Sequence, residues 1–96
     1  MIADLLKNLN AIGRENSVSR KTLTGLTGLS DRKLRSTIEN ERRAGELICS
    51  HMDPGGGYYL PEMSLELRAY VNEQRSRIQS QILALAPLER ALNGGM

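Results

Sequence analysis

Nucleophilic and acid-base chemistry has few candidate side chains in this chain, which contains one histidine, His51, and one cysteine, Cys49. The sequence shows neither a motif of paired carboxylates nor a metal-ligand cluster, so no nucleophile is placed beside a base. We therefore expect no enzymatic activity and no cofactor or metal. A single cysteine excludes an internal disulfide, and we interpret Cys49 as a small hydrophobic residue of a strand, with a reactive thiol as the alternative.

Basic side chains offer a different chemistry, the binding of phosphate groups and base edges. The whole chain has a net charge of only +2, but residues 19–43 contain seven basic and three acidic residues, which leaves a local net charge of +4. The basic residues are Arg20, Lys21, Arg32, Lys33, Arg35, Arg42 and Arg43. This concentration indicates a binding surface for nucleic acid.

The helix that carries most of these basic groups is expected to begin at Ser30, whose hydroxyl can accept hydrogen bonds from the amides of the first turn. Leu34 and Ile38 are four residues apart and therefore share one side of this helix. The opposite side carries Arg32, Ser36, Glu39 and Arg43. One side is thus expected to pack, and the other to present charged and hydrogen-bonding groups.

A shorter helical pattern precedes it at residues 19–28, with Leu23 and Leu26 on its apolar side. Gly28 can adopt a positive φ and stop this helix, so that the two helices form a helix-turn-helix. Gly25 is unfavourable inside a helix by about 1 kcal/mol relative to alanine. We expect a close approach of another helix at Gly25.

A β-hairpin is expected after the second helix. Gly45 suits a helix C-cap, residues 46–50 predict a short apolar strand, residues 53–57 a turn, and residues 58–60 the returning strand. The sequence LSDRKLR at residues 29–35, then Gly45, the apolar strand and GGYYL at residues 56–60, resembles small winged-helix DNA-binding proteins of bacteriophages and mobile elements. The resemblance covers most of the chain and implies sequence-specific binding of double-stranded DNA.

The resemblance also implies roles for individual residues. It implies that the major-groove contacts come from Arg32, Lys33, Arg35, Ser36 and Asn40, with Arg43 nearer the DNA backbone. It implies that the other backbone contacts come from Arg20, Lys21, Thr22 and Ser30. The candidate contacts in the wing are His51, Gly55 and Gly56, although a flexible turn without DNA contact is the interpretation we favour there, because the tip has no Lys or Arg.

One residue departs from the family pattern. Where the family tends to show a leucine, one turn beyond Ile38, this chain has Glu41. We therefore expect the end of this helix to pack loosely.

The first residues of the chain predict a covering helix. Residues 1–11 show the three-and-four spacing of an amphipathic helix, which we expect to end at Gly13 and to cover the apolar sides of the two central helices. Residues 14–18 predict a polar connector, in which Val18 can add a third short strand to the hairpin.

Residues 65 to about 86 predict a long final helix that Ser64 caps. A kink or break is expected near Leu85, because the ring of Pro87 clashes with the preceding turn and its nitrogen donates no hydrogen bond. The helix has a heptad seam, interrupted by Gln74 and Gln81 and otherwise formed by Leu67, Val71, Ile78, Leu85, Leu88 and Leu92. The seam either packs back on the domain or pairs with a second copy, and we favour a homodimer because the seam is longer than one small domain can cover.

The chain has 96 residues, 40% of them hydrophobic and none of them Phe or Trp, which allows one domain with a modest core. We divide it into a winged-helix DNA-binding domain at residues 1–62, a C-terminal helix for dimerisation at residues 63–93 and a tail at residues 94–96. No apolar run approaches the roughly 20 residues that span a bilayer, and the first residues do not resemble a secretory signal. We therefore expect a cytoplasmic protein without a membrane partner.

The predicted fold class is mainly α with a small β-hairpin, a winged helix-turn-helix followed by a long C-terminal helix. The predicted function is that of a transcriptional regulator or an accessory factor of phage or mobile-element DNA metabolism. The alternative is a non-catalytic adaptor that uses the winged helix as a scaffold and binds a protein partner through the long helix.

Overall fold

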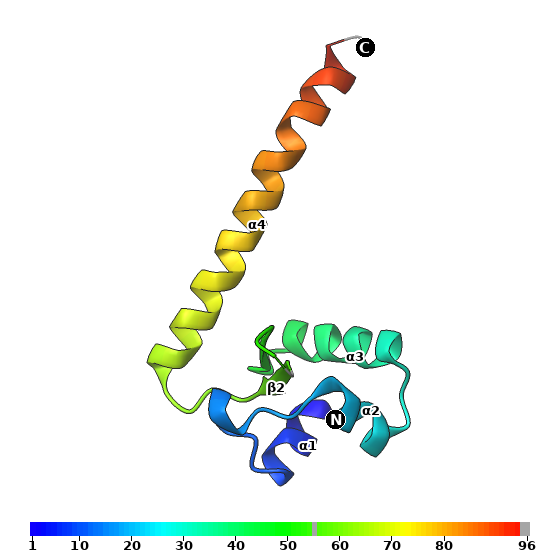
Figure 1. Ribbon diagram of the computed structural model, residues 1–96, viewed down its shortest axis with the longest axis vertical. Coiled ribbons are helices and arrows are strands. Elements are labelled where there is room, and N and C mark those ends of the chain that lie inside the picture. Colours follow the sequence, from blue (N-terminus) through cyan, green and yellow to red (C-terminus); the bar gives the residue numbers. More distant parts are fainter. Residues whose placement is uncertain (55, 95–96) are drawn as a thin grey trace.

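The computed structural model describes residues 1–54 and 56–94. Four helices, one turn of 3-10 helix and two strands follow each other within these residues (Figure 1). In chain order they are α1 (Ile2–Asn8), η1 (Arg14–Asn16), α2 (Arg20–Thr27), α3 (Asp31–Arg43), β1 (Cys49–His51), β2 (Gly57–Tyr59) and α4 (Ser64–Asn93). The predicted fold class is confirmed, since three helices, an antiparallel hairpin and a long C-terminal helix follow in the order of a winged helix-turn-helix.

The core lies among α1, α2, α3 and the segment that leads into β1. Its largest fully buried side chains are Ile2, Leu6, Leu23, Leu34, Ile38, Ile48 and Cys49. Because α3 cannot bury its apolar side alone, the predicted amphipathic helix α1 packs against it, and the buried side chains of α1 share one core with Leu23 of α2. α1 itself is shorter than expected, because it ends at Asn8 and Asn10 then takes a positive φ of 56°, whereas Gly13 lies outside the helix.

Glu41 fixes the end of α3 to the start of α1. Its carboxylate accepts hydrogen bonds from the backbone amides of Ile2 (2.7 Å) and Ala3 (3.0 Å) and lies 3.2 Å from the amino group of Met1. These amides open a helix and have no partner within it. The prediction of loose packing at Glu41 is therefore wrong, because a carboxylate at this position caps a neighbouring helix instead of filling the core as a leucine would.

Two serine caps and one glycine define the helix-turn-helix. The backbone amide of Thr22 donates to Ser19 Oγ and that of Lys33 donates to Ser30 Oγ, each at 3.1 Å. Gly28 ends α2 with a left-handed φ of 74°, which confirms the predicted stop. The expected close approach at Gly25 is wrong, because a Cβ built at Gly25 would meet nothing within 4 Å among the described residues.

The hairpin pairs Cys49 with Tyr59, Ser50 with Tyr58 and His51 with Gly57. Both strands are shifted from the predicted ranges: β1 begins at Cys49 instead of residue 46, and β2 ends at Tyr59 because Leu60 forms a separate parallel bridge. Val18 joins Tyr58 through an antiparallel bridge, which confirms the predicted third strand as a single pair. Gly45 follows the C-cap residue Ala44 and supplies the positive φ, 105°, at the end of α3.

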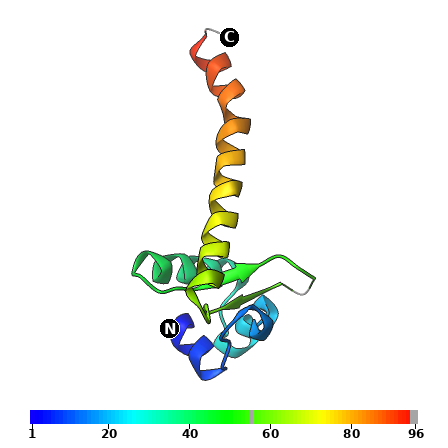
Figure 2. The same cartoon turned by 90° about the vertical axis from the view of Figure 1, so that its left-hand side faces the viewer.

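α4 rises from the domain as a single helix and projects away from the other elements (Figures 1 and 2). The predicted cap at Ser64 is wrong, because Ser64 is the first helical residue and Met63 is the N-cap. Near the start of the helix, the carboxylate of Glu66 instead accepts hydrogen bonds from the backbone amides of Glu62 (3.0 Å) and Arg14 (3.2 Å).

The helix also continues through Pro87 to Asn93, and Figures 1 and 2 show no sharp bend. The predicted kink or break is therefore wrong. Leucine and alanine, which are strong helix formers, surround Pro87 on both sides, and they carry the helix across the one missing backbone bond. None of the helices in residues 1–54 and 56–94 is long and apolar enough to cross a membrane.

Candidate nucleic-acid interface

The outward side of α3 presents polar and basic groups to solvent. Leu34 and Ile38 are buried beneath it, and the side chains predicted to contact DNA are exposed: Arg32, Lys33, Arg35, Ser36, Asn40 and Arg43. We call these six residues the α3 face. The structure therefore brings together on one surface all six residues that the resemblance assigned to α3.

The members of the α3 face differ in their partners. Arg43 lies 3.2 Å from Asn40 Oδ1 and 3.9 Å from the carboxylate of Glu39, so its charge is partly balanced within α3. Arg32, Lys33 and Arg35 form no ion pair with the residues that the structure describes. The first two turns of α3 therefore carry the basic groups that are most available to an anionic partner.

The start of α2 lies beside the start of α3. The guanidinium of Arg20 is 3.4 Å from the carboxylate of Asp31, which joins the two helix starts through an exposed ion pair. The hydroxyls of Thr22 and Ser30 take part in local hydrogen bonds, at 2.9 Å between Thr22 and Ser19 and at 3.1 Å between Ser30 and the amide of Lys33. Of the four predicted backbone contacts, Arg20 and Lys21 thus offer charge, and Thr22 and Ser30 mainly build the helix ends.

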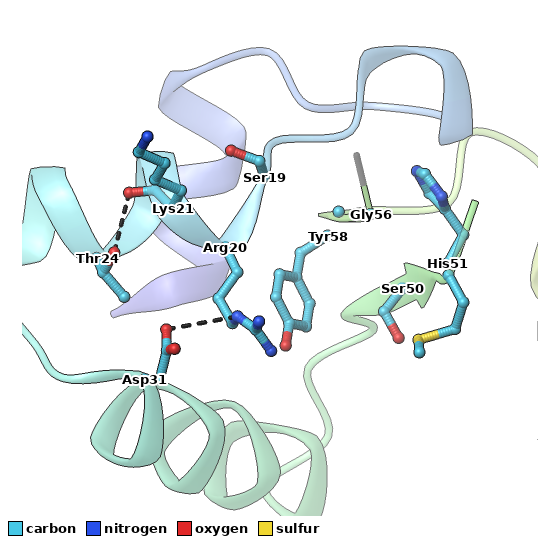
Figure 3. Close-up of a pocket in the computed structure, with 11 residues that line it drawn as sticks. Ser19, Arg20, Lys21, Thr24, Asp31, Ser50, His51, Gly56 and Tyr58 are labelled. Atoms are coloured by element: carbon cyan, nitrogen blue, oxygen red, sulfur yellow. Dashed lines mark hydrogen bonds and ion pairs between the residues drawn. The ribbon is translucent and has the colours of Figure 1, made fainter. Parts of the chain in front are cut away.

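A hollow of about 520 Å³ separates these helix starts from the hairpin (Figure 3). Arg20 extends into it beside Asp31 and the ring of Tyr58, while Lys21 points away from that ring (Figure 3). A second hollow of about 190 Å³ lies between α3 and the hairpin and is lined by Arg35 and Tyr58, among others. The surface between α3 and the wing is therefore concave and carries arginines from both helices.

The wing is attached to the connector that precedes α2. His51 Nε2 lies 2.7 Å from Ser17 Oγ, and Asp53 forms an ion pair with Arg14. His51 is half-buried, and its Nδ1 has no hydrogen-bond partner among the described residues. The sequence reasoning missed the anchoring residues Arg14 and Ser17, since nothing local to them signals a partner more than 30 residues away.

The three residues predicted as wing contacts differ in where they lie. His51 and Gly56 line the larger hollow, whereas Gly55 lies outside the described residues. The contact between His51 and Ser17 joins the hairpin to the connector before α2. The interpretation of the wing as a flexible turn without DNA contact stays a prediction.

Arg42 has a structural position despite its membership in the basic cluster. Its Nε donates to the carbonyl of Ile48 at 2.8 Å, and its guanidinium lies 5.7 Å from the ring centroid of Tyr70 at the base of α4. This cation–π contact ties α3 to α4. The charge of Arg42 is therefore held on the side of α3 that faces the hairpin and α4.

Cys49 is buried in the core, and this burial raises the pKa of its thiol to about 11. A thiol with this pKa is almost entirely protonated near neutral pH and is a poor nucleophile. Its environment matches the interpretation as a small hydrophobic residue. In the part of the chain that the structure describes, no group of three or more His, Cys, Asp or Glu could hold a metal ion.

Comparisons of this chain with models of protein families, with curated proteins and with solved structures found no match.

Proposed function

We propose that this protein binds double-stranded DNA, with α3 in the major groove and the start of α2 against the phosphate backbone. The observation that carries this proposal is the α3 face, where basic and hydrogen-bonding side chains are exposed directly opposite the buried Leu34 and Ile38. An α-helix fits the major groove, which is about 12 Å wide, and 13 residues span about 20 Å along it.

The groups on α3 match what a base-reading helix needs. Arginine can donate two parallel hydrogen bonds to guanine, and asparagine can pair with adenine in the same bidentate manner. Arg32 and Arg35 lie on the first two turns of α3, and Asn40 lies further along the helix. In this proposal Arg32 and Arg35 select bases, and Arg20, Lys21 and Arg43 set the position of the domain on the phosphates.

The position of α4 leaves the α3 face open, as this proposal requires. α4 leaves from the end of the hairpin and projects away from α3 (Figure 2). Arg32, Arg35 and Arg43 remain exposed. In this proposal the protein acts by occupying its site, as a transcriptional regulator or as an accessory factor of phage or mobile-element DNA metabolism.

The adaptor remains the second candidate function, and one observation favours it. Large apolar side chains lie exposed along α4, which suits the docking of a protein. The two candidates differ in what they require of the α3 face: DNA binding depends on its arginines, whereas an adaptor that binds through α4 does not.

The test compares single alanine variants on a duplex selected by the protein from a random library. We expect Arg32→Ala and Arg35→Ala each to weaken binding by about 1–3 kcal/mol, roughly 5- to 150-fold, as measured by fluorescence anisotropy. Arg68→Ala is the matched control, because Arg68 is an exposed arginine on α4, and its affinity should stay within about twofold of the original protein. Equal affinities for all three variants would remove α3 from the interface.

A further inference from the structure

An apolar stripe follows α4 beyond its contact with the domain. Val71, Ile78, Leu85 and Leu92 recur every seven residues, and Ile82 and Leu88 flank them on the same side by the 3.6-residue period. We call these six residues the α4 stripe. Their side chains are 40% to 79% exposed. No part of the described chain covers the stripe, so packing within the chain does not account for its apolar residues.

The domain holds only the base of α4. Glu66 accepts two backbone hydrogen bonds there, and Tyr70 lies against Arg42. None of the residues of α4 in the described chain is buried. A helix of this length would gain from packing against its own domain, but α4 instead points away from it (Figure 1).

We propose that the α4 stripe pairs with the same stripe of a second copy of this chain, and that the two helices run parallel. This inference goes beyond DNA binding and does not depend on it. A fully exposed leucine or isoleucine side chain presents on the order of 100 Å² of apolar surface. Weighted by their exposed fractions, the six stripe residues of two copies present about 700 Å² of apolar surface that pairing can bury. The flanking stems of long side chains extend this area toward the roughly 1,000 Å² of a stable interface.

The two glutamines of the seam decide the orientation. The seam has two series of residues that recur every seven positions. The first is Val71, Ile78, Leu85 and Leu92, and the second is Leu67, Gln74, Gln81 and Leu88. In a parallel pair each glutamine faces its own symmetry mate, so that the amide of one can donate to the carbonyl oxygen of the other. The four apolar residues of the first series then pack against the same residues of the second copy.

An antiparallel pair would place each glutamine opposite an apolar residue of the second copy. With Val71 beside Leu88 of the second copy, Gln74 faces Leu85 and Gln81 faces Ile78, which leaves the amides without a polar partner. The antiparallel pair would bring Arg68 near Glu89, but both are exposed, and exposed ion pairs contribute little. Unpaired amides in an apolar seam cost more than such an ion pair returns, so the parallel arrangement is favoured.

The remaining face of α4 provides matched controls. Leu83 is 63% exposed and lies opposite the stripe, together with Pro87. A substitution at Leu83 changes the same helix by a residue of the same type without touching the proposed seam. Pro87 likewise lies outside the seam, so the heptad pattern continues past it.

The first experiment measures the mass of the full chain by sedimentation equilibrium without DNA. We expect twice the monomer mass of 10.6 kDa at tens of micromolar protein. Leu85→Glu should raise the dimer dissociation constant at least tenfold, whereas Leu83→Glu should leave it within twofold, with equal helical circular dichroism for the folded domain. A monomer at 100 µM, or equal effects of the two substitutions, would overturn the proposal.

The second experiment tests the orientation by oxidative crosslinking. In a parallel pair the Gln81→Cys variant should form a disulfide-linked dimer by itself, because the two Cβ atoms at this layer approach each other. Leu83→Cys and the unaltered chain, with its buried Cys49, should not crosslink. If Gln81→Cys reacts only when mixed with Ile78→Cys, the helices are antiparallel and the parallel arrangement is wrong.

Discussion

Replacing Glu41 tests the contact that joins the beginning of the chain to α3. The carboxylate is 15% exposed and accepts from the amides of Ile2 and Ala3. Hydrogen bonds to a charged acceptor contribute about 1.5–3 kcal/mol each, and water can replace part of this. We therefore expect Glu41→Ala to lower the free energy of unfolding by about 2–4 kcal/mol, or the melting temperature by roughly 10–25 °C.

The same contact predicts a dependence on pH. Burial raises the pKa of Glu41, but the hydrogen bonds from Ala3 and Ile2 and the charge of the Met1 amino group outweigh burial, and the pKa is lowered. A carboxyl group whose pKa is lower in the folded state stabilises the protein above its unfolded pKa, near 4.3, and loses this contribution as the pH falls through the folded pKa. The difference in stability between the original protein and Glu41→Gln should thus shrink below about pH 4.

Urea unfolding followed by circular dichroism measures both effects. Glu39→Ala is the control, because Glu39 lies two residues away, is exposed and has only a 3.9 Å ion pair with Arg43, so its removal should cost no more than about 0.5 kcal/mol. If the free energy of unfolding of Glu41→Ala lies within about 0.5 kcal/mol of that of the original protein, the carboxylate does not cap α1 and the explanation of its position is wrong.

Three further predictions concern single residues. A Cβ at Gly57 would lie 2.9 Å from Ser17 Oγ, so Gly57→Ala should destabilise the protein by about 1–3 kcal/mol. Gly25→Ala, in open space within α2, should stabilise it by about 0.5–1 kcal/mol. Chemical unfolding measures both, and a change of the same sign in the two variants would contradict this explanation. Because burial raises the pKa of Cys49, its thiol should react with a disulfide reagent at pH 8 at least 100-fold more slowly in the folded than in the urea-unfolded chain, and similar rates would show that it is accessible. Pro87→Ala should increase the helical circular dichroism signal or its thermal midpoint, since it restores a backbone hydrogen bond in α4; a decrease would mean that the proline stabilises the helix.

Local rules predicted the parts of the fold that depend on neighbouring residues. The cap at Ser30, the left-handed Gly28 and the presence of a hairpin after α3 all follow from groups within a few positions of each other. The order of these elements was enough to predict the fold class. The α3 face was also predictable, because the spacing of Leu34 and Ile38 determines which side of the helix is exposed.

The features that could not be predicted depend on contacts between distant residues. Glu41 caps a helix that lies 38 residues earlier, and His51 bonds to Ser17 across 34 residues, so neither partner is visible in a local pattern. Pro87 and Ser64 were misjudged for another reason: a rule for one residue type was applied without its neighbours, which are the helix formers around Pro87 and the carboxylate of Glu66 beside Ser64. The roles of the residues on the α3 face in DNA binding stay predictions.

Measuring DNA binding across a series of salt concentrations tests the central proposal most directly. The purified protein is titrated onto a labelled duplex, and the logarithm of the affinity is plotted against the logarithm of the salt concentration. Because about 0.9 counterions are released for each phosphate contacted, the three proposed phosphate contacts of Arg20, Lys21 and Arg43 should give a slope of roughly −3 for each bound domain. A linear decrease of this size supports DNA binding by this surface, whereas no binding at low salt would contradict it.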